Sequence, residues 1–228
     1  MTLTMEEKFK KLQEPLSKDD IEFRIGNVYK GGYTILLYKT ARVDTKRLND
    51  VFGLQWKRNH YIDTKGNVVC VISIYNNDIK EWVSREDVGS ESNTEKEKGA
   101  YSDAFKRSST TFGVGSELYN APFIWIPTGT KEKADGRGHE LQNKFDIERD
   151  IKRGKIVEME GDSEKITKIA IQIGQQTHTF YNGSNTGDNL ENKSAVTSVV
   201  KAHLKKDQHG KEQVDKIFND TGYTYRPF

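Results

Sequence analysis

Three consecutive β-rich runs decide the fold of this chain: LQWKRNHYI at residues 54–62, NVVCVISIY at 67–75 and IKEWVSREDV at 79–88. Their β-branched and aromatic content is typical of strands. Short links of turn-forming residues, Thr64–Gly66 and Asn76–Asp78, join the runs. Links of this kind usually connect antiparallel neighbours. The runs therefore predict an antiparallel β-meander.

A helical stretch that ends at Phe112 follows the meander. It opens with a capping box, Ser92-Asn93-Thr94-Glu95, and meets Gly113, a typical C-terminal stop. At about 100° per residue, one apolar stripe should pack on the meander: Tyr101, Ala104, Phe105, Ser108 and Phe112. The opposite side carries polar residues: Asp103, Lys106, Arg107 and Thr110. The expected core is therefore β-β-β-α.

Shorter elements flank this core. We expect a helix over 4–13, a capped turn over 17–20, strands over 21–25 and 29–39, and a helix over 45–52 that stops at Gly53. Residues 154–181 predict a hairpin or three-stranded element, followed by a loop over 182–192, a short helix over 194–204 and a polar tail over 205–228. We assign the chain to the α+β class, with a β-meander packed on a long helix and a small C-terminal β-hairpin/helix appendage.

The composition changes after Pro127, where residues 128–137 become rich in glycine and charge. Such a stretch is typical of a linker. We therefore divide the chain into a core domain over 1–127, a linker or mobile loop over 128–145, and a small β/α region with a polar tail over 146–228.

Composition limits the possible functions. The 36 Lys and Arg are offset by 34 Asp and Glu, so the net charge of +2 says little about nucleic acid and the distribution of charge must decide. A single cysteine, Cys70, excludes a disulfide framework and a Cys-based zinc cluster. The five histidines have no ligand spacing, so we expect no metal site. Without a signal-type start or an apolar run of about twenty residues, we expect a cytoplasmic protein and no membrane contact.

Motifs of common enzymes are missing from the sequence. It has no phosphate-binding Gly-x-x-x-x-Gly-Lys-Ser/Thr loop, which an ATP-driven recombinase would need, and no Gly-x-Ser-x-Gly elbow. Cys70 lies in an apolar run and is better interpreted as a buried small hydrophobe than as a nucleophile. The strongest enzymatic alternative is a metal-dependent nuclease that uses the acidic cluster Glu81, Glu86, Asp87 and Glu91. Adjacent strand residues point to opposite faces, so Glu86 and Asp87 are poorly placed to share one ion. We favour a subunit contact or plain solvation for the cluster, and no enzyme activity.

Lys106 and Arg107 could hold successive phosphates from one side of a rigid helix, because such contacts supply most sequence-independent affinity for nucleic acid. The alternative is an ordinary solvated face in which Lys106 or Arg107 pairs with Asp103. Further cations lie where a groove could use them: Arg24, Lys30, Lys57, Arg58, Lys65, Lys96 and Lys98. Aromatic residues among them are either core residues or stacking platforms for bases: Phe23, Tyr29, Tyr33, Trp56 and Tyr61.

Several motifs around the helix together resemble the signature of the Rad52 superfamily of single-strand annealing proteins. They are Arg85-Glu86-Asp87-Val88-Gly89, Glu91-Ser92, Lys96-Glu97-Lys98-Gly99-Ala100, Asp103-Ala104-Phe105-Lys106-Arg107, Phe112-Gly113-Val114-Gly115 and Leu118-Tyr119. Leu12–Leu16 before Ile21–Arg24 is similar to the opening of the phage Sak-like branch. The resemblance covers roughly residues 10–125.

The resemblance implies an ATP-independent annealing protein that forms rings or helical homo-oligomers and binds single-stranded DNA by its backbone, with no nucleotide or metal cofactor. It assigns DNA contacts to Lys106 and Arg107, with Arg24 as a further candidate, and an outer contact to Lys65 and to Lys96 or Lys98. The family often has another basic residue one turn after the Lys-Arg pair, where this chain has Thr110. Lys30, Lys57 or Arg58 would then compensate.

The expected role is homologous recombination and DNA repair, in a phage-encoded protein that acts in the cytoplasm of a bacterial host cell. The C-terminal third would recruit a single-strand binding protein or buttress the oligomer. A recombination mediator that acts mainly through protein contacts is the second candidate, and the metal-dependent nuclease is the third.

Overall fold

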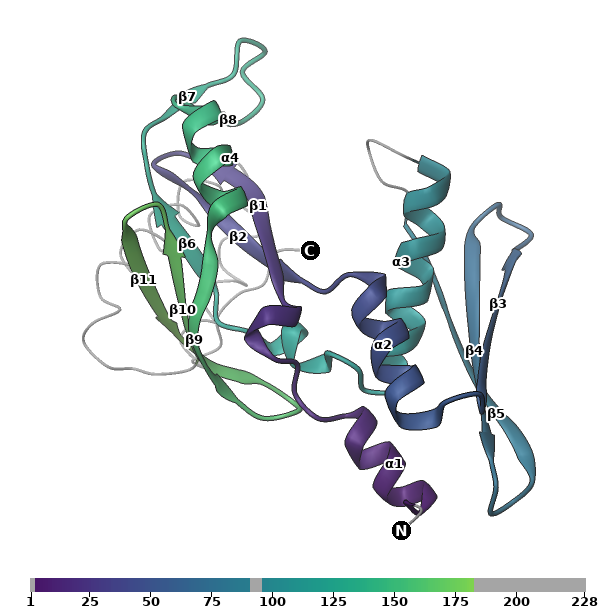
Figure 1. Cartoon of the computed structure of the whole chain (residues 1–228). Coiled ribbons are helices and arrows are strands. Elements are labelled where there is room, and N and C mark those ends of the chain that lie inside the picture. Colours follow the sequence, from purple (N-terminus) through teal and green to yellow (C-terminus); the bar gives the residue numbers. More distant parts are fainter. Residues whose placement is uncertain (1–2, 91–95, 183–228) are drawn as a thin grey trace, which may run out of the picture. The chain divides into compact units, whose positions relative to one another are not determined.

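The computed structural model describes residues 3–90 and 96–182. In these ranges the chain is a mixed α+β protein with four α-helices and antiparallel sheets, which confirms the α+β class (Figure 1). The chain divides into two units. The described residues of the first are 3–27, 34–90, 96–124 and 143–182, and those of the second are 28–33 and 125–142. Among the described residues, no helix combines the length and apolar character needed to cross a membrane.

The three β-rich runs form one antiparallel sheet in the order β3-β4-β5 (Figure 1). Its strands are β3 (Trp56–Ile62), β4 (Val68–Asn76) and β5 (Glu81–Val88). Ile72 of β4 pairs with Arg58 on one side and Arg85 on the other. Side chains directly opposite each other share a face. The alternating Cys70, Ile72 and Ile74 are fully buried, so they mark the inner face of the sheet.

Helix α3 (Lys96–Thr111) packs on that inner face. The Ser108 hydroxyl donates to the carbonyl oxygen of Cys70 at 2.5 Å, and four of the five expected stripe residues are buried: Ala104, Phe105, Ser108 and Phe112. Tyr101, the fifth, is 42% exposed, because its ring lies beside His60 of β3, an edge strand, instead of over the centre of the sheet. The expected capping box at 92–95 lies outside the described residues.

Two helices upstream complete the packing around α3. Helix α1 (Met5–Leu12) begins with a capping box between Thr4 and Glu7. Helix α2 (Ala41–Phe52) begins four residues before the expected 45 and ends at Gly53, which has φ of +57°. The Phe9 ring of α1 lies 5.7 Å from Phe52 and 6.4 Å from Phe112. An aromatic cluster therefore joins α1 to the ends of α2 and α3.

A second three-stranded sheet has the order β1-β2-β6. Its strands are β1 (Glu22–Tyr29), β2 (Gly32–Tyr38) and β6 (Ile124–Pro127). The short helices η1 (Lys18–Asp20) and η2 (Ser116–Asn120) precede β1 and β6. The first strand runs longer than the expected 21–25 and takes in Gly26, against which Thr34 and Leu36 of β2 pack closely.

The third sheet lies within residues 154–181, where the sequence predicts a hairpin or a three-stranded element. It has the order β11-β10-β9, with β9 (Lys155–Gly161), β10 (Ile166–Ile173) and β11 (Gln176–Tyr181) all antiparallel. The segment before it was not expected to be helical, but forms α4 (Lys144–Arg153). Ion pairs at helical spacing, Lys144–Glu148 and Asp146–Arg149, stabilise that helix.

The stretch expected to be a linker contains a hairpin of β7 (Thr130–Glu132) and β8 (His139–Leu141). Lys131 and Glu140 face each other across it and form an ion pair at 3.2 Å, which supports pairing despite the glycine-rich turn. The expected loop, helix and tail after residue 182 lie outside the described residues.

Replacement of Gly89 by Ala tests the contact between β5 and α3. Gly89 follows β5, and a Cβ atom there would press on the Ala100 carbonyl oxygen and lie 2.6 Å from the Ala104 nitrogen. Because helix backbone cannot yield as a flexible side chain does, we expect the free energy of unfolding to fall by about 1–3 kcal/mol. Denaturant unfolding measures this, and the exposed Val88→Ala is the control. Equal stability of both variants would contradict the packing.

Candidate nucleic-acid interface

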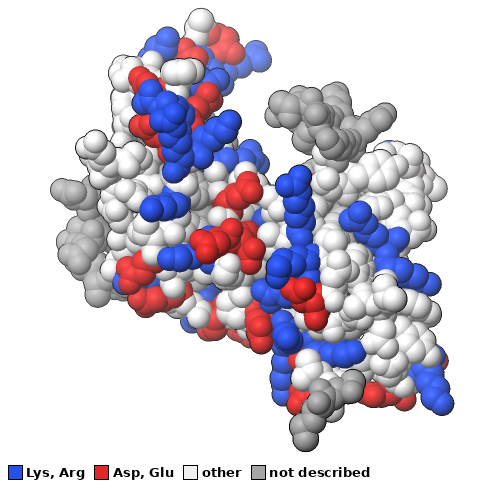
Figure 2. Space-filling view, in the orientation of Figure 1, with Lys and Arg blue, Asp and Glu red and all other residues white. Residues whose placement is uncertain are grey.

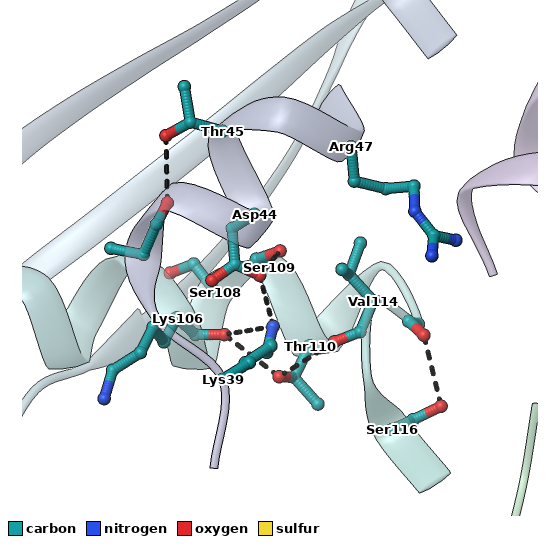
Figure 3. Close-up of polar contacts among 12 residues, drawn as sticks. Lys39, Asp44, Thr45, Arg47, Lys106, Ser108, Ser109, Thr110, Val114 and Ser116 are labelled. Atoms are coloured by element: carbon teal, nitrogen blue, oxygen red, sulfur yellow. Dashed lines mark hydrogen bonds and ion pairs between the residues drawn. The ribbon is translucent and has the colours of Figure 1, made fainter. Parts of the chain in front are cut away.

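A buried ion pair fixes the position of α3. The Lys39 ammonium, just after β2, contacts the Asp44 carboxylate of α2, and the two residues are 5% and 0% exposed. The Ser109 hydroxyl of α3 donates to the same Asp44 oxygen at 2.6 Å, and Lys39 also donates to the Lys106 carbonyl oxygen at 3.4 Å (Figure 3). One charged cluster thus joins the end of β2, α2 and α3.

Burial controls the ionisation of this pair. It lowers the pKa of the Lys39 ammonium and raises the pKa of the Asp44 carboxyl, because each charged group loses hydration, while the charge of its partner opposes the shift. Burial also raises the pKa of Glu117, whose carboxylate accepts from the Leu16 amide at 2.7 Å. The two charges of the pair depend on each other, so loss of one leaves the other buried and unpaired.

The predicted phosphate-binding residues Lys106 and Arg107 point in different directions from α3. The Lys106 amine points away from the buried cluster (Figure 3) and lies 3.6 Å from Asp103. The Arg107 guanidinium lies 3.3 Å from Asp87 of β5. Their side chains are 29% and 45% exposed. Each cation therefore reaches solvent and holds one carboxylate through a partly exposed pair, which costs little to exchange for another anion.

Two further arginines lie along the flanks of α3. Arg58 of β3 holds its guanidinium 4.4 Å from the centre of the Phe105 ring, and Arg85 of β5 lies 4.9 Å from the Phe112 ring and donates to the Thr111 carbonyl oxygen. Ile72 is the cross-strand partner of both arginines, so both lie on the inner face of the sheet with α3. Arg85 was not among the predicted contacts, because its place opposite Ile72 depends on a four-residue turn over 77–80 and not on the predicted link over 76–78.

The other predicted contacts are dispersed. Arg24 is exposed on β1, and Lys30 is exposed in the turn after β1, which belongs to the second unit. Lys65 is exposed in the turn between β3 and β4. Lys96 and Lys98 lie in the first turn of α3, and their side chains are outside the described part of the chain. Among the predicted residues of the first unit whose side chains are described, Arg58, Lys106 and Arg107 lie on or beside α3.

The aromatic candidates also separate. Tyr33 is a core residue at 2% exposure. Trp56 stacks on Phe105 at 6.3 Å and donates its indole N–H to Asn49. Tyr61 is half-exposed on the outer face of the sheet, where Lys57 covers Trp82 at 4.1 Å. None of these rings lies beside both Lys106 and Arg107 within the described residues.

The acidic cluster considered for a nuclease is split by the sheet. Asp87 pairs with the inward Cys70, and Glu86 pairs with Val71 on the outer face, where it accepts from Tyr61 at 3.3 Å. Cys70 is buried, and burial raises the pKa of its thiol, as suits a core residue. Over residues 3–90 and 96–182, no group of three or more His, Cys, Asp or Glu could hold a metal ion.

Charge on the surface follows this arrangement. In the view of Figure 2, Lys and Arg side chains spread over the part formed by α2, α3 and the β3-β4-β5 sheet, with few Asp or Glu among them. A helix fixed by a buried cluster and flanked by arginines suits a polyanion whose backbone runs along it.

A family model described as Rad52/22 family double-strand break repair protein matches residues 5–137. No curated protein and no solved structure matches the chain. The match covers α1 to β7 and so includes α3 and both strands that flank it.

Removal of the Asp44 carboxylate tests whether the buried pair holds α2 and α3 in place. Asp44→Ala leaves Lys39 buried without a partner, so we expect the free energy of unfolding to fall by about 3–5 kcal/mol. The double variant Lys39→Met, Asp44→Leu should recover most of that loss, because it removes both charges.

The control is Asp50→Ala, which breaks the exposed Lys46–Asp50 pair on the same helix and should change stability little. Urea unfolding of the four proteins gives the comparison. An Asp44→Ala protein as stable as Asp50→Ala would show that the buried pair does not hold the helices.

Proposed function

As the chain belongs to the Rad52/22 family of double-strand break repair proteins, we propose that it binds single-stranded DNA and anneals complementary strands in homologous recombination. The proposal extends to ATP-independent action without a cofactor, to a ring or helical homo-oligomer, and to the phage Sak-like branch. In this proposal the protein is not an enzyme, and its annealing core consists of α3 on the β3-β4-β5 sheet.

The observation that carries the proposal is the cationic surface of α3. Lys106 and Arg107 reach solvent from neighbouring sides of the helix, and Arg58 lies against Phe105 on its flank. Phosphate oxygens can replace Asp103 and Asp87 as partners of Lys106 and Arg107, because partly exposed pairs are weak. Such contacts read the backbone and leave the bases free to pair.

Annealing follows from charge neutralisation. Two DNA strands repel each other through their phosphates, and cations on the protein reduce that repulsion while they release counterions. Each subunit supplies only a few contacts, so an oligomer that presents many subunits along one strand multiplies them into strong binding. Encounters between complementary strands then last long enough for base pairs to form.

Thr110 explains why this chain needs cations outside the Lys-Arg pair. Thr110 is uncharged, so it adds no cation one turn after the pair. Its hydroxyl donates to the Lys106 carbonyl oxygen at 2.9 Å. Arg58 and Arg85 supply charge on the flanks of the same helix. We propose Arg24, Lys65, Lys96 and Lys98 as further DNA contacts of the first unit, and Lys30 as a separate contact of the second unit.

A second candidate is a recombination mediator that acts mainly through protein contacts. The outer face of the β3-β4-β5 sheet favours it, since Tyr61, Trp82 and Val88 are each about two-fifths exposed there. A mediator of this kind would not anneal naked strands by itself. Separately from this candidate, we propose that the C-terminal region contacts a single-strand binding protein.

Annealing of complementary fluorescent oligonucleotides, without nucleotide or metal, tests the proposed function. We expect rapid annealing by the native protein and a loss of at least about tenfold in single-strand affinity for Lys106→Ala, Arg107→Ala, because two charge-assisted contacts disappear. The control Lys10→Ala, Lys11→Ala removes two cations from the exposed end of α1. Light scattering must show that every variant keeps the native oligomer.

Native protein that fails to anneal naked strands but still forms its oligomer would favour the mediator. Strand loss that requires a divalent metal would identify a nuclease. Equal annealing by both double variants would show that the DNA does not bind at Lys106 and Arg107 of α3.

The dependence of affinity on salt gives a separate prediction. Each phosphate contact to a single strand contributes about 0.7 to the slope of log K against log salt concentration. The Lys106→Ala, Arg107→Ala protein should therefore show a slope smaller by about 1.4, whereas the α1 control keeps the native slope. An unchanged slope in the α3 variant would mean that neither residue contacts phosphate.

A further inference from the structure

We propose that the groove between α2 and β3 holds one nucleotide of the bound strand, with its base stacked on Tyr101 and the phosphates on either side of it bound by Arg42 and Arg58. The inference rests on the proposed function, because it names a subsite on the path of the same single strand. It also assigns a DNA contact to Arg42, which the sequence analysis did not name, and to Tyr101, which it predicted only as a core residue.

The groove has the size and the polarity for a nucleotide. Its volume is about 810 Å³, within the range of small-molecule sites, and it is open to solvent. One side is α2, the other is β3, and the start of α3 completes it. Hydroxyl and amide groups of Thr45, Asn49, Asn59 and Ser102 line it between the charged residues. An apolar peptide would find few partners there.

The cations of the groove are available to an anion. Arg42 is exposed and forms no ion pair with any described residue. Arg58 also forms none in that part of the chain, and its guanidinium is held in place by the Phe105 ring. Lys46 is already paired with Asp50 at 2.7 Å. Two arginines on opposite sides of the groove, both without a carboxylate partner, therefore face the space between α2 and β3.

Tyr101 supplies the stacking surface. It is the one residue of the apolar stripe of α3 that remains substantially exposed, and its ring packs against His60 at 5.1 Å and an angle of 52°. Burial lowers the pKa of His60, which favours the neutral form of its ring. A rigid, half-exposed aromatic ring beside cations is the arrangement on which single-stranded nucleic acids stack their bases.

The groove also continues the proposed DNA surface. Ser102 lines it, and Lys106 follows Ser102 by one helical turn on the same side of α3. Arg58 belongs to both, because it lines the groove and covers Phe105. A strand whose phosphates follow α3 past Lys106 therefore reaches the groove without a change of helix face.

The test compares the assembled native protein with variants on two probes of equal length, an oligothymidylate and an abasic backbone. Tyr101→Ala should weaken binding of oligothymidylate about 5- to 100-fold, the range of one lost stacking contact, and leave abasic binding unchanged. Tyr101→Phe should retain native binding. Tyr181→Ala, a similarly exposed tyrosine on β11, is the control.

Arg42→Ala should weaken both probes equally and reduce the salt slope by about 0.7. Native oligothymidylate affinity in Tyr101→Ala, or an equal loss on both probes, would overturn the stacking site. An unchanged salt slope in Arg42→Ala would overturn the phosphate contact. If the native protein binds neither probe, the proposed function itself fails, so the two failures are distinct.

Discussion

The buried pair of Lys39 and Asp44 is the interaction on which the arrangement around α3 depends. Its two charges lie at the end of β2 and on α2, and the pair reaches α3 through the Ser109 hydroxyl and the Lys106 carbonyl. Desolvation makes such a pair costly to form and more costly to break. The role of the cluster is therefore to position structure: it fixes the backbone from which Lys106 projects. It also fixes α2, which forms one wall of the groove.

The cations on the surface above this cluster form ion pairs that are weak enough to be exchanged for another anion. Lys106 and Arg107 hold Asp103 and Asp87 through partly exposed contacts, while Arg58 and Arg85 rest on aromatic rings. Arginine on a ring keeps its orientation and its charge. A DNA backbone can displace the weak carboxylate partners without leaving a buried charge behind. In the proposed function, the binding is tight in sum and weak at each contact, which allows release of the duplex after annealing.

Sequence patterns predicted the parts of this account that depend on periodicity. Turn residues placed β3, β4 and β5, and the apolar spacing of α3 identified Ala104, Phe105, Ser108 and Phe112 as buried. Other features depend on distant contacts that no local pattern encodes. In the sequence Lys39 resembles a surface cation that follows a strand. Its burial becomes evident only from its contact with Asp44 in the folded protein. Tyr101 has the spacing of a core residue, but its exposure follows from its position beside β3. Helix α4 was not predicted, although Ile147 and Ile151 lie one helical turn apart in its sequence.

Lysine footprinting would test most directly whether α3 carries the DNA. An amine-reactive reagent labels the assembled protein with and without single-stranded DNA, and mass spectrometry measures the labelling of each lysine. The account predicts that DNA protects Lys106, whose amine reaches solvent beside Asp103, and leaves Lys10 of α1, which is 74% exposed, as reactive as before. Saturating DNA that leaves Lys106 fully reactive and protects lysines on other elements would contradict the central claim.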